Sequence, residues 1–380
     1  MRLTQAWLLA SALAFATCTG FVAAEWPTQT FHIAVFALLA WSALRGGVTS
    51  SPVLLLPAFG AAQLLAGGSI APWETREMVV HWAALAGVFC IARTFAGSQD
   101  LRRMFLSIFL IFGAALAVLT LLTLNSSANR VVWFIPCEPP GVVGTFTSPN
   151  NYAQFVELAL PVAAWFAIRD ARRVWGYAIA AGVLYASVIA TASRAGAFQC
   201  TLELVSFLPL AWKARARSRR TRAGSAAVWL IPATALAFTL VAGWDNLSRR
   251  FLEPDPYGGR REYVQAALNM VRQRPLTGFG LGAYSVASNA FAVKDFPFYP
   301  DHAHPNHVHN DWLEFAVDGG IFFFAAVLAL FVARARKMLR HPWSWGLAAV
   351  ALHALVDYPF PRPAVSGWMF ALLGLLYAAD

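Results

Sequence analysis

Long apolar segments alternate with short polar ones along most of the chain. Because about 20 apolar residues cross ~30 Å of hydrocarbon, the apolar segments predict an all-α polytopic membrane protein, a single membrane domain over 1–380 with about twelve transmembrane helices. The two longest polar segments are an extracytoplasmic loop at 125–151 and a large periplasmic loop at 245–311, between the ninth and tenth spans. The predicted spans are 5–24, 31–44, 51–70, 78–95, 104–124, 152–168, 174–192, 195–212, 226–244, 312–333, 343–358 and 365–379.

The composition excludes a soluble enzyme and a disordered chain. Hydrophobic residues make up 58% of the sequence and charged residues 13%, against roughly 25% charged residues in soluble domains. The cysteines form no Cys-x-x-Cys pair, so neither a zinc site nor a disulfide framework is indicated. They are Cys18, Cys90, Cys137 and Cys200.

The distribution of positive charge predicts the orientation. The net charge is +10, which in a soluble chain would suggest nucleic acid. Placing both termini in the cytoplasm puts most Lys and Arg residues in cytoplasmic loops, six of them within 213–222, as the positive-inside rule requires. The basic residues are therefore interpreted as orientation signals that contact membrane lipids, with no nucleic-acid partner. A cleaved secretory signal is the alternative for the first span, because residues 22–24 resemble a cleavage site.

The large loop contains one predicted helix and one predicted turn. Apolar residues recur at i, i+3, i+4 and i+7 within about 260–273, which predicts an amphipathic helix that ends before Pro275. A glycine-rich stretch follows at 275–282. A dinucleotide-binding motif would need a strand before it, so we interpret this stretch as a tight turn.

Four histidines lie just before the tenth span. A metal site, a solvated loop without a role and a catalytic base are three readings of this cluster. His309 is favoured as a base, because Asn310 and Asp311 place it at a helix N-terminus, where backbone N–H groups attract anions. The four are His302, His304, His307 and His309.

Arginines on the outer face supply the complementary chemistry. Arg194 lies between two spans, where an arginine normally requires an anionic partner, and Arg260 and Arg261 begin the loop helix. Guanidinium groups bind phosphate oxygens in a bidentate manner, although anchoring to lipid headgroups is the simpler alternative. Arginines together with a histidine base favour a lipid-linked phosphate substrate whose diphosphate is the leaving group.

From about 144 to 361 the chain resembles the O-antigen ligase and polymerase superfamily. The family patterns are matched with three departures. Ala195 stands in place of the first small residue after Ser-Arg in the family's Ser-Arg-Gly motif, and Asp318 stands where the family has Glu. The aromatic position of the loop helix falls on Val264, beside Tyr263. The matching segments are Gly-Thr-Phe-Thr-Ser-Pro-Asn-Asn-Tyr-Ala (144–153), Ser-Arg-Ala-Gly (193–196), Gly-Arg followed by Pro-Leu-Thr-Gly-Phe-Gly (259–280), His-Asn before Leu-Glu and Asp-Gly (309–319), and His-Ala-Leu-Val-Asp-Tyr-Pro (353–359).

The resemblance implies a multi-pass glycosyltransferase of the bacterial inner membrane with a periplasmic active site. Such an enzyme moves a glycan from undecaprenyl diphosphate to an acceptor hydroxyl, with inversion and without a metal or other cofactor. It implies that Arg194 and Arg260 hold the diphosphate and that His309 activates the hydroxyl. The further substrate-binding candidates are Arg261, Asn150, Asn151, Asn310 and Asp357.

Several of these roles have alternatives. Asn150 and Asn151 can equally cap the following helix. His353 and Asp357, four residues apart, are expected to share one helix face, where a buried pair is as plausible as catalysis. The simplest acceptor is lipid A–core; a polymerase using a second lipid-linked unit and a protein O-oligosaccharyltransferase are the alternatives. A transporter of the same lipid would instead place its charges near the bilayer midplane.

Overall fold

The computed structural model shows a mostly helical protein. It describes residues 1–47, 51–124, 126–127, 130–136, 142–170, 172–217, 222–253, 260–291 and 306–378. The longer helices are α1 (Arg2–Cys18), α2 (Trp26–Leu44), α3 (Leu55–Leu65), α4 (Pro72–Ala96), α5 (Gln99–Leu124), α6 (Pro149–Arg169), α7 (Val174–Ala190), α8 (Arg194–Arg217), α9 (Arg222–Ala242), α11 (Arg260–Gln273), α13 (Asp311–Val332) and α16 (Pro363–Ala378). The shorter elements are η1 (Pro52–Leu54), α10 (Asp245–Phe251), α12 (Tyr284–Ala287), η2 (Ser288–Phe291), α14 (Ala335–Arg340), η3 (Pro342–Ser344), α15 (Gly346–His353) and the antiparallel pair β1 (Arg130–Val131) and β2 (Ile135–Pro136).

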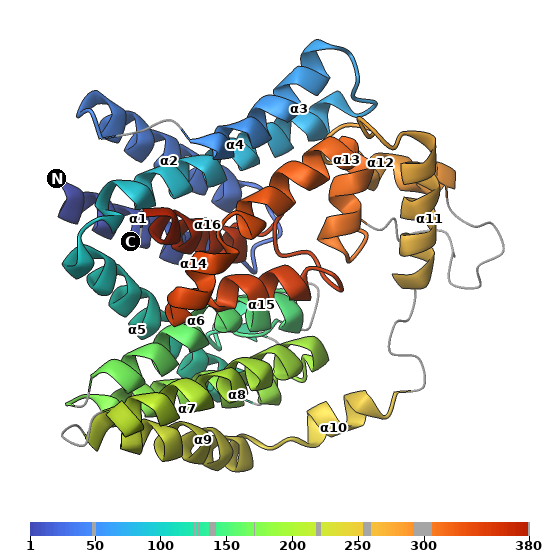
Figure 1. Ribbon diagram of the computed structural model, residues 1–380. Helices are drawn as coiled ribbons and strands as arrows, with labels where there is room; N and C mark the ends of the chain where they lie inside the picture. The colour runs from blue at the N-terminus through green and yellow to red at the C-terminus, as the bar shows by residue number, and fades with distance from the viewer. Residues whose placement is uncertain are drawn as a thin grey trace.

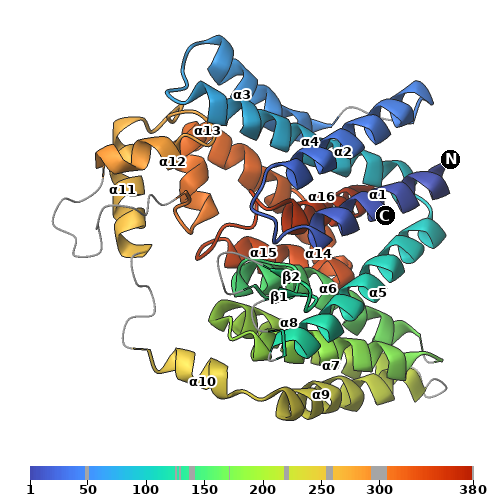
Figure 2. The same cartoon turned by 180° about the vertical axis from the view of Figure 1, so that it is seen from behind.

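The helices form layers around a buried centre. α16 packs against α4 and α1, and α6 packs against α7, α8 and α15. In Figure 1, α2, α3 and α4 lie on one side of α16, and α7, α8 and α9 lie on the other. Most residues of α6 and α16 are buried, as expected for helices at the centre of a bundle. Figure 2 shows α11 and α12 at the side of the bundle, next to α13.

The number of membrane spans stays a prediction. Every predicted span overlaps a helix, but within the described chain only three helical stretches are long and apolar enough to cross a membrane: Pro72–Ala96, Gln99–Leu124 and Asp311–Arg340. A fourth is added if Trp229–Ala242 and Asp245–Phe251, bent by 88°, count as one span. α15 is much shorter than the span expected at 343–358, because the chain leaves the helix after His353 and continues to α16 as a loop.

The glycine-rich turn at 275–282 is hydrogen-bonded to α13. Helical geometry in α13 is interrupted at Gly320, with φ 62° and ψ −168°, where Ile321 N donates to the carbonyl of Pro275 (2.9 Å). The Asp318 carboxylate accepts from the backbone N–H of Gly282 (2.7 Å) and of Tyr284 (3.1 Å). The turn expected at 275–282 thus follows a helix, and these hydrogen bonds attach the segment carrying α11 and α12 to α13.

We predict that Gly320→Ala destabilises this junction. An alanine at Gly320 would hold a strained positive φ, and its Cβ would collide with the carbonyl of Leu276. Strain of this kind costs about 1–3 kcal/mol, so the melting temperature in detergent should fall by several degrees. Gly176→Ala, in α7, is the matched control, because its Cβ would meet open space. Equal melting temperatures for the two variants would contradict this account.

Candidate functional site

The loop that joins α15 to α16 is held by groups from three other helices. His81 Nε2, on α4, donates to the carbonyl of Phe360 (2.9 Å). The backbone N–H of Phe360 donates to Asp311 Oδ2, on α13 (2.9 Å). Arg260 Nη1, on α11, donates to the carbonyl of Val356 (3.1 Å). These contacts bring α4, α11 and the start of α13 together around one loop.

His309 faces this loop in a strained conformation. Its φ of 57° is unusual for a non-glycine residue, and such strain tends to cluster at functional sites. Its Nδ1 lies 3.4 Å from Asp357 Oδ1, and its ring stacks on Tyr263 (6.2 Å between centroids, 19°) and meets Tyr358 edge-on (4.7 Å, 82°). The His309 side chain is 28% exposed, whereas that of Asp357 is 1% exposed. The imidazole therefore lies beside a buried carboxylate and remains accessible.

Asp357 lies beyond the end of α15, in the loop. Its carboxyl group is buried and lies near the side chains of His309, His353 and Arg260. An ionised carboxylate is only an acceptor, so Asp357 favours the form of His309 that carries a proton on Nδ1.

The segment around His309 is fixed by the first turns of α13. Glu314 accepts from the backbone N–H of Val308 (2.8 Å) and contacts His307 Nδ1 (2.9 Å). Asn310 is the N-cap of α13, because its Oδ1 accepts from the backbone N–H of Leu313 (3.0 Å). The predicted substrate ligand Asn310 therefore has a structural role in positioning the preceding histidine.

His353 has a partner other than the expected one. Its Nδ1 lies 2.6 Å from Glu157 Oε1 on α6, and both side chains are fully buried. The expectation that His353 and Asp357 share one helix face is wrong, because α15 ends at His353. The Glu157–His353 pair instead connects α6 to the last residue of α15, where the loop that carries Asp357 begins.

Asn150 and Asn151 do not cap α6. Ser148 is the cap, since its Oγ accepts from the backbone N–H of Asn150 (3.2 Å). The side chain of Asn150 accepts from Ser193 Oγ (2.8 Å), and that of Asn151 donates to Gln154 Oε1 (3.0 Å). Of the two alternatives for these asparagines, the capping role is therefore excluded, and contact with substrate stays a prediction.

Arg194 contacts the chain at the end of α10. Its Nη1 donates to the carbonyl of Arg250 (2.8 Å) and lies 3.5 Å from Glu253 Oε2. Glu253 also pairs with Arg250 Nη1 (3.6 Å). Arg194 thus has the anionic partner that its position requires. Arg260, by contrast, contacts the loop that carries Asp357, and Arg261 lies exposed on α11.

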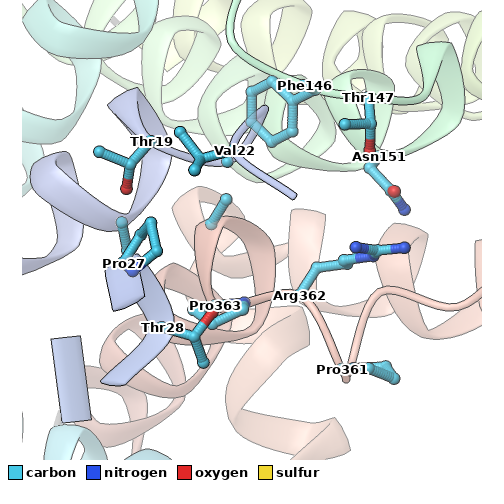
Figure 3. A pocket seen from close by; sticks show the side chains of 13 residues that line it. Thr19, Val22, Pro27, Thr28, Phe146, Thr147, Asn151, Pro361, Arg362 and Pro363 are labelled. Atoms are coloured by element: carbon cyan, nitrogen blue, oxygen red, sulfur yellow. The ribbon is translucent and has the colours of Figure 1, made fainter. Parts of the chain in front are cut away.

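Aromatic and cationic residues that sequence reasoning did not single out complete the site. The ring of His307 stacks on Tyr358 (4.4 Å, 21°), and the guanidinium of Arg362 lies over the same ring (5.0 Å). Arg362 and Asn151 both line a cavity of about 80 Å³, and Figure 3 shows their polar groups reaching into the same space. In the sequence, Tyr358 lies within the segment 353–359 that resembles a family pattern, and Arg362 is flanked by prolines.

A metal site stays an untested reading of the histidine cluster. Within the described residues, no group of three or more His, Cys, Asp or Glu side chains is placed to hold a metal ion. His302 and His304 lie outside those residues.

A comparison with protein families gives a match over part of the chain. The O-antigen ligase family model matches residues 177–328, a segment that contains Arg194, Arg260 and His309. Residues 177–328 are therefore similar to the O-antigen ligase family. The family and the apolar helices together identify a membrane enzyme of the glycan ligase and polymerase type. A search of curated proteins found no match.

We predict that His309→Gly is more stable than His309→Ala. Both variants remove the imidazole and its contacts, but only glycine adopts a φ of 57° without cost. The left-handed conformation costs other residues about 1–2 kcal/mol, so the glycine variant should melt at the higher temperature. Thermal unfolding of both purified variants measures the difference, and a more stable alanine variant would show that this residue is not strained.

Proposed function

We propose that this O-antigen ligase-like protein transfers a glycan from undecaprenyl diphosphate to an acceptor hydroxyl on the periplasmic face of the bacterial inner membrane. The observation that carries the proposal is the arrangement of His309, strained and partly exposed, against the buried carboxylate of Asp357 and beside the loop contacted by Arg260. Together with the family match, this arrangement supplies a base and a cation at one site.

In the proposed reaction His309 is the general base. The acceptor O–H gives its proton to Nε2, while its oxygen attacks the anomeric carbon from the face opposite the diphosphate. The bond between that carbon and the phosphate oxygen breaks, so the configuration inverts. Asp357 orients the imidazole and stabilises the imidazolium that forms. A general base of this kind contributes roughly 10²- to 10⁴-fold to the rate.

The arginines are proposed to stabilise the leaving group. Negative charge develops on the diphosphate as the bond breaks, and guanidinium donors fixed in position stabilise such charge. Arg260 is already directed to the loop that carries Asp357. Arg194 is paired with Glu253, so a diphosphate that binds Arg194 has to displace this carboxylate.

We predict that transfer by the purified protein requires these residues. With undecaprenyl-diphosphate glycan as donor, lipid A–core as acceptor and EDTA present, wild type should form the conjugate. His309→Ala should lower kcat by roughly 10²- to 10⁴-fold, and Arg260→Ala or Arg194→Ala by roughly 10²-fold or more. Product is measured by gel mobility and mass spectrometry.

The outcomes of this assay distinguish the alternatives. Elongated lipid-linked glycan without conjugate would identify a polymerase, and transfer only to a protein acceptor would identify a protein O-oligosaccharyltransferase. Movement of the lipid across vesicles, with neither product formed, would contradict the enzyme proposal and leave a transporter.

We also predict that Glu253→Gln strengthens donor binding. The substitution removes the carboxylate that competes with diphosphate for Arg194. Because this ion pair is partly exposed, the KM for the donor should fall only about two- to fivefold, and less at high salt. Asp245→Asn in α10 removes the same charge from an exposed position and is the control. An unchanged or higher KM for Glu253→Gln would argue against diphosphate binding by Arg194.

A further inference from the structure

A large cavity is lined by Arg362, the residue whose guanidinium lies over the ring of Tyr358. Its volume is about 840 Å³, and its walls are the segment between α1 and α2, the first turns of α2 and α4, and the end of the loop before α16. It shares six lining residues with the small cavity in Figure 3, among them Thr147 and Arg362. A space of this size is in the range of small-molecule binding sites.

The charges that line the cavity balance. Arg76 and Arg362 face the same space as Glu25 and Glu77, and within the described part of the chain none of these four side chains forms an ion pair. A diphosphate or another polyanion would meet two carboxylates here, whereas Arg194 and Arg260 lie outside this lining. The cavity therefore suits a ligand that needs many hydrogen bonds and little net charge.

The remaining lining supplies an aromatic face, further polar groups and aliphatic side chains such as Val22, Met78 and Val80. Trp73, in the first turn of α4, is 64% exposed and lines the cavity. Gln29, His32 and Asn306 add donors and acceptors. Amides, carboxylates and guanidinium groups pair with vicinal hydroxyls, and an indole face covers the apolar face of a sugar ring. This combination fits an oligosaccharide.

The cavity is connected to the reacting groups. Arg362 Nη2 donates to the hydroxyl of Tyr358 (3.3 Å), and the ring of Tyr358 packs on His309. His32 and His81 also line the cavity; His32 Nε2 lies 3.2 Å from His81 Nδ1, and His81 binds the loop before α16. An occupant of the cavity would therefore lie one aromatic ring away from His309.

We infer that this cavity is the oligosaccharide-binding site of the transferase, with Trp73 as the platform for a sugar ring. The inference rests on the proposed function, and it specifies the place where the sugar rings of a substrate bind. The sugar comes either from the acceptor or from the glycan of the donor, and kinetics distinguish these two sources.

Trp73→Ala tests the inference. The KM for the substrate whose sugar occupies the cavity should rise roughly three- to tenfold, with kcat nearly unchanged, as expected for the loss of one aromatic contact. Trp73→Phe keeps a ring and should restore most of the affinity. Trp175→Ala, in α7, removes a tryptophan of similar exposure (63%) outside this cavity and is the matched control.

Each outcome is decisive. A higher KM for the acceptor alone identifies the acceptor sugar as the occupant, and a higher KM for the donor alone identifies the donor glycan. No change in either KM, or the same change in Trp175→Ala, overturns the inference.

A binding experiment separates this inference from the proposed function. If wild type transfers nothing, calorimetry with core oligosaccharide released from lipid A, and with free donor glycan, still tests the site. Binding of one of these probes by wild type and Trp175→Ala, but not by Trp73→Ala, supports the cavity even then. No binding of either probe, or equal binding by all three proteins, overturns it.

Discussion

The site depends on how the loop between α15 and α16 obtains hydrogen-bond partners for its backbone. When a chain leaves helical geometry in an apolar bundle, its free N–H and C=O groups need partners inside the protein. Here the partners are His81 from α4, Asp311 from α13 and Arg260 from α11. These hydrogen bonds to the loop backbone also fix the position of the loop relative to α4, α11 and α13. The geometry around Asp357 therefore follows from the need of this backbone for hydrogen-bond partners inside the protein.

The same constraint explains why a strained histidine can be maintained. Glu314 and Asn310 fix the backbone on both sides of His309, and Asp357 lies in a loop that other helices hold in place. Strain persists only where the surroundings determine the conformation. The strained backbone at His309 lowers the stability of the protein, and it holds the imidazole between two tyrosines and a carboxylate, as expected of a preorganised site.

The sequence was informative where local pattern decides structure. The helical period predicts α11, the Asn310-Asp311 pair predicts the start of α13, and the run of glycines predicts the turn that α13 supports. Sequence reasoning missed contacts between distant segments: His81 and Phe360 are 279 residues apart, and the pairing of Glu157 with His353 joins helices that no motif links. The length of α15 was overestimated because apolar residues continue past the helix end, and apolar length alone does not settle the number of spans.

The central claim is that the imidazole of His309 is the base, and chemical rescue of His309→Gly tests it most directly. Glycine is suited to the backbone conformation at this position and leaves a space the size of the imidazole beside Asp357. We expect glycan transfer by this variant to be nearly abolished and to be restored by added imidazole, in a saturable manner. Transfer at the wild-type rate without imidazole would contradict the account.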